Sequence, residues 1–320
     1  MNRRDFALGT LAAAAAAQWP LSASAQAVGN VKMMIPANPG GGWDQTGRAL
    51  GAAMLSVKAV PSVQFDNKGG AAGTIGLAQF VNASKGDGSA ILVGGMVMVG
   101  GIVLSKSPVD LTMVTPLARL TSEYEVVVVP ASSPYKTLGD LLKAFKADPG
   151  KVAWNGGSAG GTDHILAGLI ARAVGVEPTK VNYVAAKGGG DQIANIVGGH
   201  VTAGIAGLGE FAEHIKSGRM RALAVSGPAK IDGIPSLKEQ GVDVVLGNWR
   251  GVFGAPAITA AQRDALIAAI KAGVDSAAWK ETLAKMGWES VFLSGDAFKA
   301  FLDEDIKRIR GILESLGLAK

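Results

Sequence analysis

The sequence contains no cysteine and only three histidines among its 320 residues. Without cysteine, the chain can form no disulfide, no thiolate metal site and no cysteine nucleophile, and its redox compartment stays open. The three histidines, His164, His200 and His214, are too dispersed in the sequence to suggest a metal-binding cluster. We therefore expect no metal and no cofactor.

Aromatic residues, runs of basic residues and long apolar runs are also scarce. Aromatics make up only 6% of the chain, and no run of four basic residues occurs, which argues against nucleic-acid binding. No segment after the N-terminal region reaches the ~18 charge-free apolar residues needed to span a bilayer. The formal net charge of +5 is a mild excess that can steer small anions and implies no more.

Glycine, in contrast, is abundant. The 45 glycines are about twice the usual share, and they cluster in loops between apolar runs. Because 48% of the residues are hydrophobic, the chain has ample core for one large or two medium domains. The glycines therefore indicate backbone-lined turns in a folded protein.

Residues 1–25 have the organisation of an export signal. A basic start with paired arginines (Met1–Phe6) precedes an alanine-rich apolar segment (Ala7–Leu21) and a cleavage motif at Ala23–Ala25. The paired arginines resemble a twin-arginine signal, although the general secretion route stays open. We predict a soluble, exported protein, located in the periplasm and cleaved after Ala25.

The rest of the chain alternates strand-like and helical segments. In the first part, strands at 31–35, 60–65 and 90–93 alternate with helices at 44–56 and 74–83. This order is typical of a parallel sheet with helices on both faces, whose ligands bind beyond the carboxyl ends of the strands. The same strand, glycine loop and helix unit recurs in the second part of the chain.

Two such parts predict an α/β clamp of two lobes, each a mixed, mostly parallel sheet flanked by helices. The chain crosses between them near 124–130 and returns near 247–253. We assign residues 26–123 plus 248–320 to the first lobe and residues 124–247 to the second.

The most distinctive stretch is Pro36–Asp44, with two prolines and three consecutive glycines between a strand and a helix. Such a loop exposes bare backbone N–H groups at the positive end of the helix, which favours an anion. Gly40, Gly41 and Gly42 are therefore candidate donors to a ligand carboxylate. Ser158–His164 repeats this arrangement in the second half of the chain and is the expected counterpart.

Six stretches of the sequence follow one another in an order that matches a known family. They are Pro36–Asp44 with Arg48 behind it, Asn67–Gly76, Ser158–His164, Tyr183–Gly190 followed by Gly198–Val201, Gly218–Val225 and Trp249–Gly251. Together they resemble the substrate-binding proteins of tripartite tricarboxylate transporters, the Bug family, and the spacing of the fourth stretch is similar to that of the citrate-type receptors. Ala72 and Asp191 depart from the common pattern, and an acidic residue near the pocket leaves the ligand's charge open.

The resemblance implies a periplasmic clamp of the type II binding-protein kind, a monomer that delivers a di- or tricarboxylate to membrane permease subunits. It also implies that backbone amides of the first and second ligand loops, helped by ordered water, hold the carboxylate. The candidate ligand-binding residues are Asn38, Gly40, Gly41, Gly42, Trp43, Asp44, Ser158, Gly160, Gly161, Thr162, His164, Tyr183, Gly189 and Arg250.

Several of these residues have a second interpretation. Arg250 can pair with a second ligand carboxylate or form a salt bridge between the lobes. Trp43 can flank the ligand or cap the core, and Asp44 with Arg48 can form a helix-surface pair. His164 is as compatible with a helix-start or core position as with ligand contact.

Two other functional classes fit the sequence less well. A hydrolase triad of Ser158, His164 and either Asp163 or Asp191 lacks the G-x-S-x-G elbow, and the glycines at 70–76 only approximate a dinucleotide-binding motif. We therefore expect no enzyme. A sensory protein that signals to a membrane kinase would have the same ligand chemistry, so this alternative stays open.

Overall fold

The computed structural model describes residues 28–319. The predicted signal peptide and its cleavage site after Ala25 lie outside the described residues. Within them, no helix is both long and apolar enough to cross a membrane.

Ten strands form a sheet with the hydrogen-bonded order β2-β1-β3-β9-β4-β7-β5-β6, and β10 and β8 pair with β4 outside this path. The strands are β1 (Val31–Ile35), β2 (Val63–Asn67), β3 (Ala90–Gly95), β4 (Thr115–Pro130), β5 (Ala153–Gly156), β6 (Asn182–Ala185), β7 (Ala203–Gly207), β8 (Met220–Val225), β9 (Gly247–Gly254) and β10 (Glu289–Ser294).

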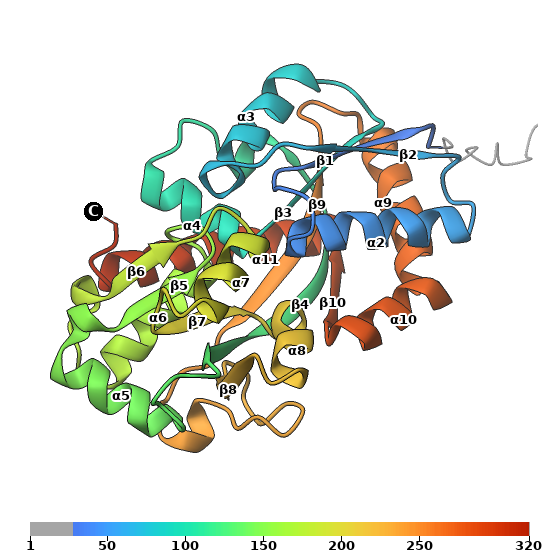
Figure 1. The fold of residues 1–320 in the computed structure, drawn as a ribbon. Helices are drawn as coiled ribbons and strands as arrows, with labels where there is room; N and C mark the ends of the chain where they lie inside the picture. Colours follow the sequence, from blue (N-terminus) through green and yellow to red (C-terminus); the bar gives the residue numbers. More distant parts are fainter. Residues whose placement is uncertain (1–27, 320) are drawn as a thin grey trace, which may run out of the picture.

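The helices lie around this sheet (Figure 1). They are α2 (Gly42–Ser56), α3 (Thr74–Ala83), α4 (Met96–Ser105), α5 (Leu138–Ala147), α6 (Thr162–Ala173), α7 (Gly189–Val197), α8 (Leu208–Lys216), α9 (Ala260–Asp275), α10 (Ala277–Met286) and α11 (Gly295–Ser315). Thr137 and Thr259 form capping boxes at the starts of α5 and α9.

Strand β4 connects the two lobes of the clamp. Its first half pairs with β9 and β10, and its second half pairs with β7 and β8. Strands β1, β2 and β3 are parallel in the first lobe, as are β5, β6 and β7 in the second, so the predicted mixed α/β clamp is confirmed. The residue boundaries proposed above for the lobes stay a prediction.

The C-terminal helix α11 reaches both lobes. It contacts α4 and β4, and near its end Ser315 accepts a hydrogen bond of 2.8 Å from Arg172 of α6. Its apolar face is buried, with Phe298, Ile309 and Leu313 at 0% exposure. The helical spacing of these apolar residues therefore gives the helix one face that packs against the rest of the protein.

The five elements predicted above for the first part of the chain are found within a few residues of their predicted bounds, whereas α4 and β10 were not predicted. Helix α4 is apolar almost all round, and six of its ten residues are buried, so its sequence shows no alternation of polar and apolar faces. The first half of β4 also escaped prediction, because polar residues interrupt its apolar positions. Only the fully buried run Val126–Val129 gave a clear strand signal.

A close backbone contact between the lobes gives a test of this arrangement. A Cβ atom on Gly100 of α4 would overlap the carbonyl oxygen of Gly160 in the loop before α6. We predict that Gly100→Ala destabilises the protein by about 1–3 kcal/mol through overpacking, measured as a lower melting temperature. Gly311→Ala on α11 is the matched control, because a Cβ there meets nothing within 4 Å. An unchanged melting temperature for Gly100→Ala would contradict the contact.

Candidate ligand-binding site

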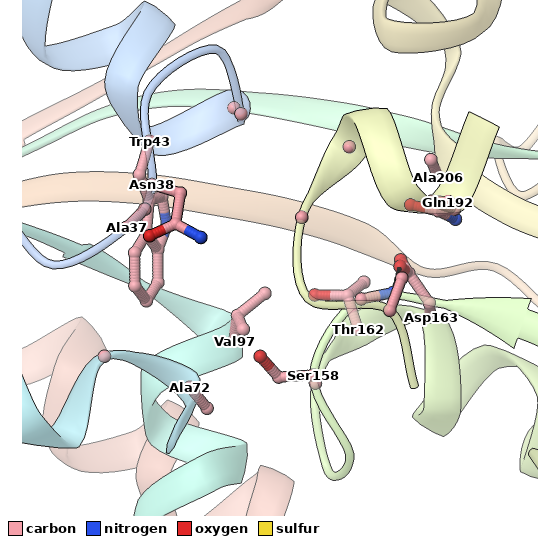
Figure 2. Close-up of a pocket in the computed structure, with 18 of the residues that line it drawn as sticks. Ala37, Asn38, Trp43, Ala72, Val97, Ser158, Thr162, Asp163, Gln192 and Ala206 are labelled. Atoms are coloured by element: carbon pink, nitrogen blue, oxygen red, sulfur yellow. Dashed lines mark hydrogen bonds between the residues drawn. The ribbon is translucent and has the colours of Figure 1, made fainter. Parts of the chain in front are cut away.

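A cleft lies between the two lobes, at the carboxyl ends of the parallel strands. Its walls come from the loops after β1 and β2 on one side and from the loops after β5, β6 and β7 on the other, and its cavity volume is about 190 Å³. Figure 2 shows Asn38 and Trp43 on one side of this space, opposite Ser158, Thr162 and Asp163. The cleft is therefore large enough for a small organic molecule.

Four helices begin at this cleft without a side-chain cap. The N-cap residues of α2, α6, α7 and α8 are Gly41, Gly161, Gly188 and Gly207, and all four line the cleft. Uncapped first turns leave backbone N–H donors free, and the positive ends of the helix dipoles point toward the same space. The cleft is therefore suited to binding an anion.

The first glycine loop is held by Asp44. The Asp44 carboxylate accepts hydrogen bonds of 2.9 Å each from the Gly40 N–H, the Arg48 Nε and the Asn67 amide. Burial raises the pKa of this carboxyl, but the hydrogen bonds from Arg48, Gly40 and Asn67 together outweigh it, and the net pKa is lowered. Gly40 has a φ of +88°, which favours glycine there. Asp44 therefore shapes the loop, and the predicted Asp44–Arg48 pair is confirmed.

The second glycine loop is braced by two aromatic rings. His164 accepts a hydrogen bond of 3.1 Å at Nδ1 from the Gly160 N–H and stacks on Tyr183, with ring centroids 4.2 Å apart. The Tyr183 hydroxyl donates to the Gly157 carbonyl at 3.1 Å. Burial lowers the pKa of His164 to about 4, so the ring is neutral near neutral pH and can accept at Nδ1.

Within residues 28–319, the hydroxyl group of Thr162 is unpaired at the cleft. Its side chain is 1% exposed, and its hydroxyl has no hydrogen-bond partner among the described residues. Thr162 lines the cleft at the first position of α6. Buried hydroxyls are rarely left unpaired, so a bound molecule or water is the expected partner.

The candidate residues divide into two groups. Those that line the cleft are Asn38, Gly41, Gly42, Trp43, Ser158, Gly161, Thr162, Gly189 and Arg250. Gly40, Asp44, Gly160, His164 and Tyr183 hold the two glycine loops from behind. Trp43 lines the cleft and also packs in the hydrophobic core, so it occupies both of the positions considered for it. Ligand contact by any of these residues stays a prediction.

Arg250 lies at the floor of the cleft, already paired. Its guanidinium forms a buried ion pair with Glu123 of β4 and lies 3.7 Å from Glu210 of α8. Glu123 also accepts a hydrogen bond of 2.9 Å from the Trp288 indole. The Glu123 pair lies within the first lobe, and the Glu210 contact is the salt bridge between the lobes considered above. Ligand contact by Arg250 stays a prediction.

Three acidic residues at the floor were not among the candidates: Glu125, Asp163 and Glu210. Burial and the nearby charge of Glu123 raise the pKa of Asp163 to about 7 and that of Glu210 to about 7, against usual values of 3.8 and 4.5. Burial, with the charges of Asp163 and Glu123, raises the pKa of Glu125 well above its usual 4.5. A sequence signal existed for Glu125. It stands two residues after Glu123 in the strand that crosses between the lobes, so the two side chains point to the same face of that strand.

These raised pKa values make the stability of the protein depend on pH. Between their usual pKa and about 7, Asp163 and Glu210 hold protons in the folded protein that the unfolded chain releases, so the stability they contribute is lost as the pH rises. The lowered pKa of His164 has the opposite effect, because the stability that it contributes increases as the pH rises. This increase is complete above the usual histidine pKa of 6.5. Above pH 6.5, the acidic residues therefore decide the direction.

We predict that the melting temperature of the ligand-free protein falls between pH 6.5 and about pH 8.5, and that Glu210→Gln makes the fall smaller. The groups that face Glu210 are Glu123, Asp163 and Arg250. Glu213→Gln on the exposed side of the same helix is the control. A fall of equal size in both variants would contradict the raised pKa of Glu210.

Comparison with known proteins places this chain in a family. The family model described as "Tripartite tricarboxylate transporter family receptor" matches residues 49–318. A Cupriavidus necator protein, "UPF0065 protein in gbd 5'region", is 28% identical and aligns over 100% of this chain and 99% of its own length. "Protein BugT" of Bordetella pertussis is 27% identical over 99% of this chain and 98% of its own length.

Solved structures show the same fold. The periplasmic binding protein BugD superposes with a TM-score of 0.82 at 20% identity, covering 91% of this chain and 99% of BugD. An R. palustris protein solved with adipate superposes with a TM-score of 0.81 at 21% identity, covering 94% of this chain and 99% of its own. Because the family model spans most of the chain, we conclude that this protein belongs to the tripartite tricarboxylate transporter receptor family, whose members are periplasmic solute-binding receptors.

Proposed function

We propose that the protein captures a small organic carboxylate, of the di- or tricarboxylate class, outside the cytoplasm and delivers it to the membrane subunits of a tripartite transporter. The observation that carries the proposal is the convergence of four uncapped helix N-termini on one cleft between the lobes. A related fold solved with adipate supports the ligand class. The predicted export signal supports the location.

The energy available at this site is sufficient for capture. Hydrogen bonds from amides to a charged group contribute about 1.5–3 kcal/mol each. Three or four of them, from the first turns of α2 and α6, would support binding in the micromolar range, about −8 kcal/mol, even after the cost of association. The unpaired Thr162 hydroxyl offers one more hydrogen bond.

A contact across the cleft supports closure around the ligand. The Asn38 amide of the first lobe donates to the Lys187 carbonyl of the second at 3.3 Å. Both residues line the cleft, so this hydrogen bond joins the loops on its two sides. We propose that it forms when the lobes close over the bound acid.

The arrangement does not favour a hydrolase. The Asp163 carboxylate accepts from the Gly157 N–H at 2.6 Å, and His164 Nδ1 accepts from the Gly160 N–H. Among the described residues, no group of histidine and acidic side chains is placed to hold a metal ion either. A sensory role would use the same ligand chemistry. It would be favoured by a sensor kinase encoded beside this protein in place of permease subunits.

A thermal-shift screen of the mature protein against mono-, di- and tricarboxylates tests the proposal. A ligand that binds only the folded state raises the melting temperature by mass action, by an amount that grows with its concentration. We expect at least one acid to do so. If no carboxylate shifts the midpoint, the proposed function is wrong.

A substitution in the first glycine loop tests the site itself. A Cβ on Gly41 meets only the Asn38 carbonyl oxygen, at 3.9 Å, and Gly41 lines the cleft, so a valine there fits the fold but occupies space at the site. We predict that Gly41→Val weakens binding of the acid found in the screen at least tenfold, with little change in melting temperature. Gly139→Val, in the exposed first turn of α5, is the control. If calorimetry shows unchanged affinity in Gly41→Val, the proposal that the amides of this loop bind the carboxylate is wrong.

A further inference from the structure

Glu125 is the most unusual side chain of the cleft. It lies on β4, is 0% exposed, and neither of its carboxyl oxygens accepts a hydrogen bond from a described residue. It nevertheless lines the cleft floor. A buried carboxyl without a donor destabilises the folded state, so it calls for a partner that the chain itself does not supply.

Among residues 28–319, the charged groups around Glu125 leave it without a free cationic partner. Glu123, Asp163 and Glu210 lie close enough to repel a charge on Glu125. Arg250 is the cation that faces Glu125, and it is already paired with Glu123. Asp163 is close enough to share a proton with Glu125, so without a ligand a proton can hold this pair together.

The fold itself stabilises the carboxyl groups of Asp163 and Glu210, but not that of Glu125. Asp163 and Glu210 stand in the first turns of α6 and α8, where the helix dipoles stabilise negative charge. Asp163 also accepts a hydrogen bond from Gly157. Glu125 lies within a strand and has neither form of support. Apart from the proton that it can share with Asp163, its carboxyl is left to accept hydrogen bonds from the contents of the cleft.

We propose that Glu125 receives a protonated nitrogen of the ligand, so that the ligand is a small amino-carboxylate. Its carboxylate binds the amides at the helix N-termini, and its ammonium group binds the floor at Glu125. This assignment rests on the proposed function and narrows it from carboxylates in general to those that carry a cation. A dicarboxylate would bring its second negative charge to a floor that already holds three carboxyls, beside an arginine that is paired with Glu123.

Matched ligands separate the two kinds of acid. In the first set, three carbons follow the carboxylate group, and the members are butyrate, glutarate, 4-aminobutyrate and 2-aminobutyrate. The next length repeats it with valerate, adipate, 5-aminovalerate and 2-aminovalerate. Affinities are measured by calorimetry on the wild-type protein, which needs no variant to fold. We expect an amino-carboxylate to bind at least tenfold more tightly than the monocarboxylate and the dicarboxylate of the same length.

Glu125→Gln then assigns the selectivity to this residue, because it keeps the shape and removes the charge. We expect the preference for the amino-carboxylate to fall at least tenfold, while Glu213→Gln leaves it unchanged. We also expect the ligand-free Glu125→Gln protein to melt at a higher temperature, since the variant no longer buries an unpaired carboxyl.

The outcomes distinguish this inference from the proposed function. If a dicarboxylate binds more tightly than its amino counterpart, the inference is overturned and the proposed function stands. An amino-carboxylate preference that survives in Glu125→Gln also overturns it. If no member of either set binds and the wider carboxylate screen is negative, the proposed function itself fails.

Discussion

The buried ion pair between Glu123 and Arg250 is the interaction on which the cleft depends. It joins β4 to β9, the neighbouring strands on which the chain leaves the first lobe and returns to it. A buried ion pair is tolerated only when its remaining polar atoms are satisfied. Here the Trp288 indole donates to Glu123, and Thr46 of α2 lies 3.4 Å from the Arg250 guanidinium. The pair therefore fixes the start of α2 relative to the strands between the lobes.

The parts of the site that follow from local sequence were predictable. A strand, several glycines and a helix start are adjacent in the chain, so the amide-rich loops at Gly41 and Gly161 could be recognised from their composition. The sequence did not reveal which way nearby side chains point. His164 and Tyr183 were candidates for ligand contact, and the structure shows that they stack on each other beside the second loop, which the sequence did not indicate. Local pattern identifies a loop more readily than it identifies which of its side chains face the cleft.

The acidic floor could not be predicted in the same way. Glu125, Asp163 and Glu210 come from β4, α6 and α8, and only the folded chain brings them together. Helix α4 was missed for a different reason, because an apolar helix buried on most sides has no polar face to reveal its period. The overall fold was accessible because strand and helix units repeat. The charge of the floor depends on contacts between distant units.

The free amides at the starts of α2, α6, α7 and α8 have a consequence for how such receptors can diverge. A main-chain N–H is present whatever residue stands there, except proline, so point substitutions rarely delete it. The side chains of the floor carry no such protection. If these amides bind the carboxylate as proposed, a lineage can change its ligand by altering a few floor residues while the amides are inherited unchanged.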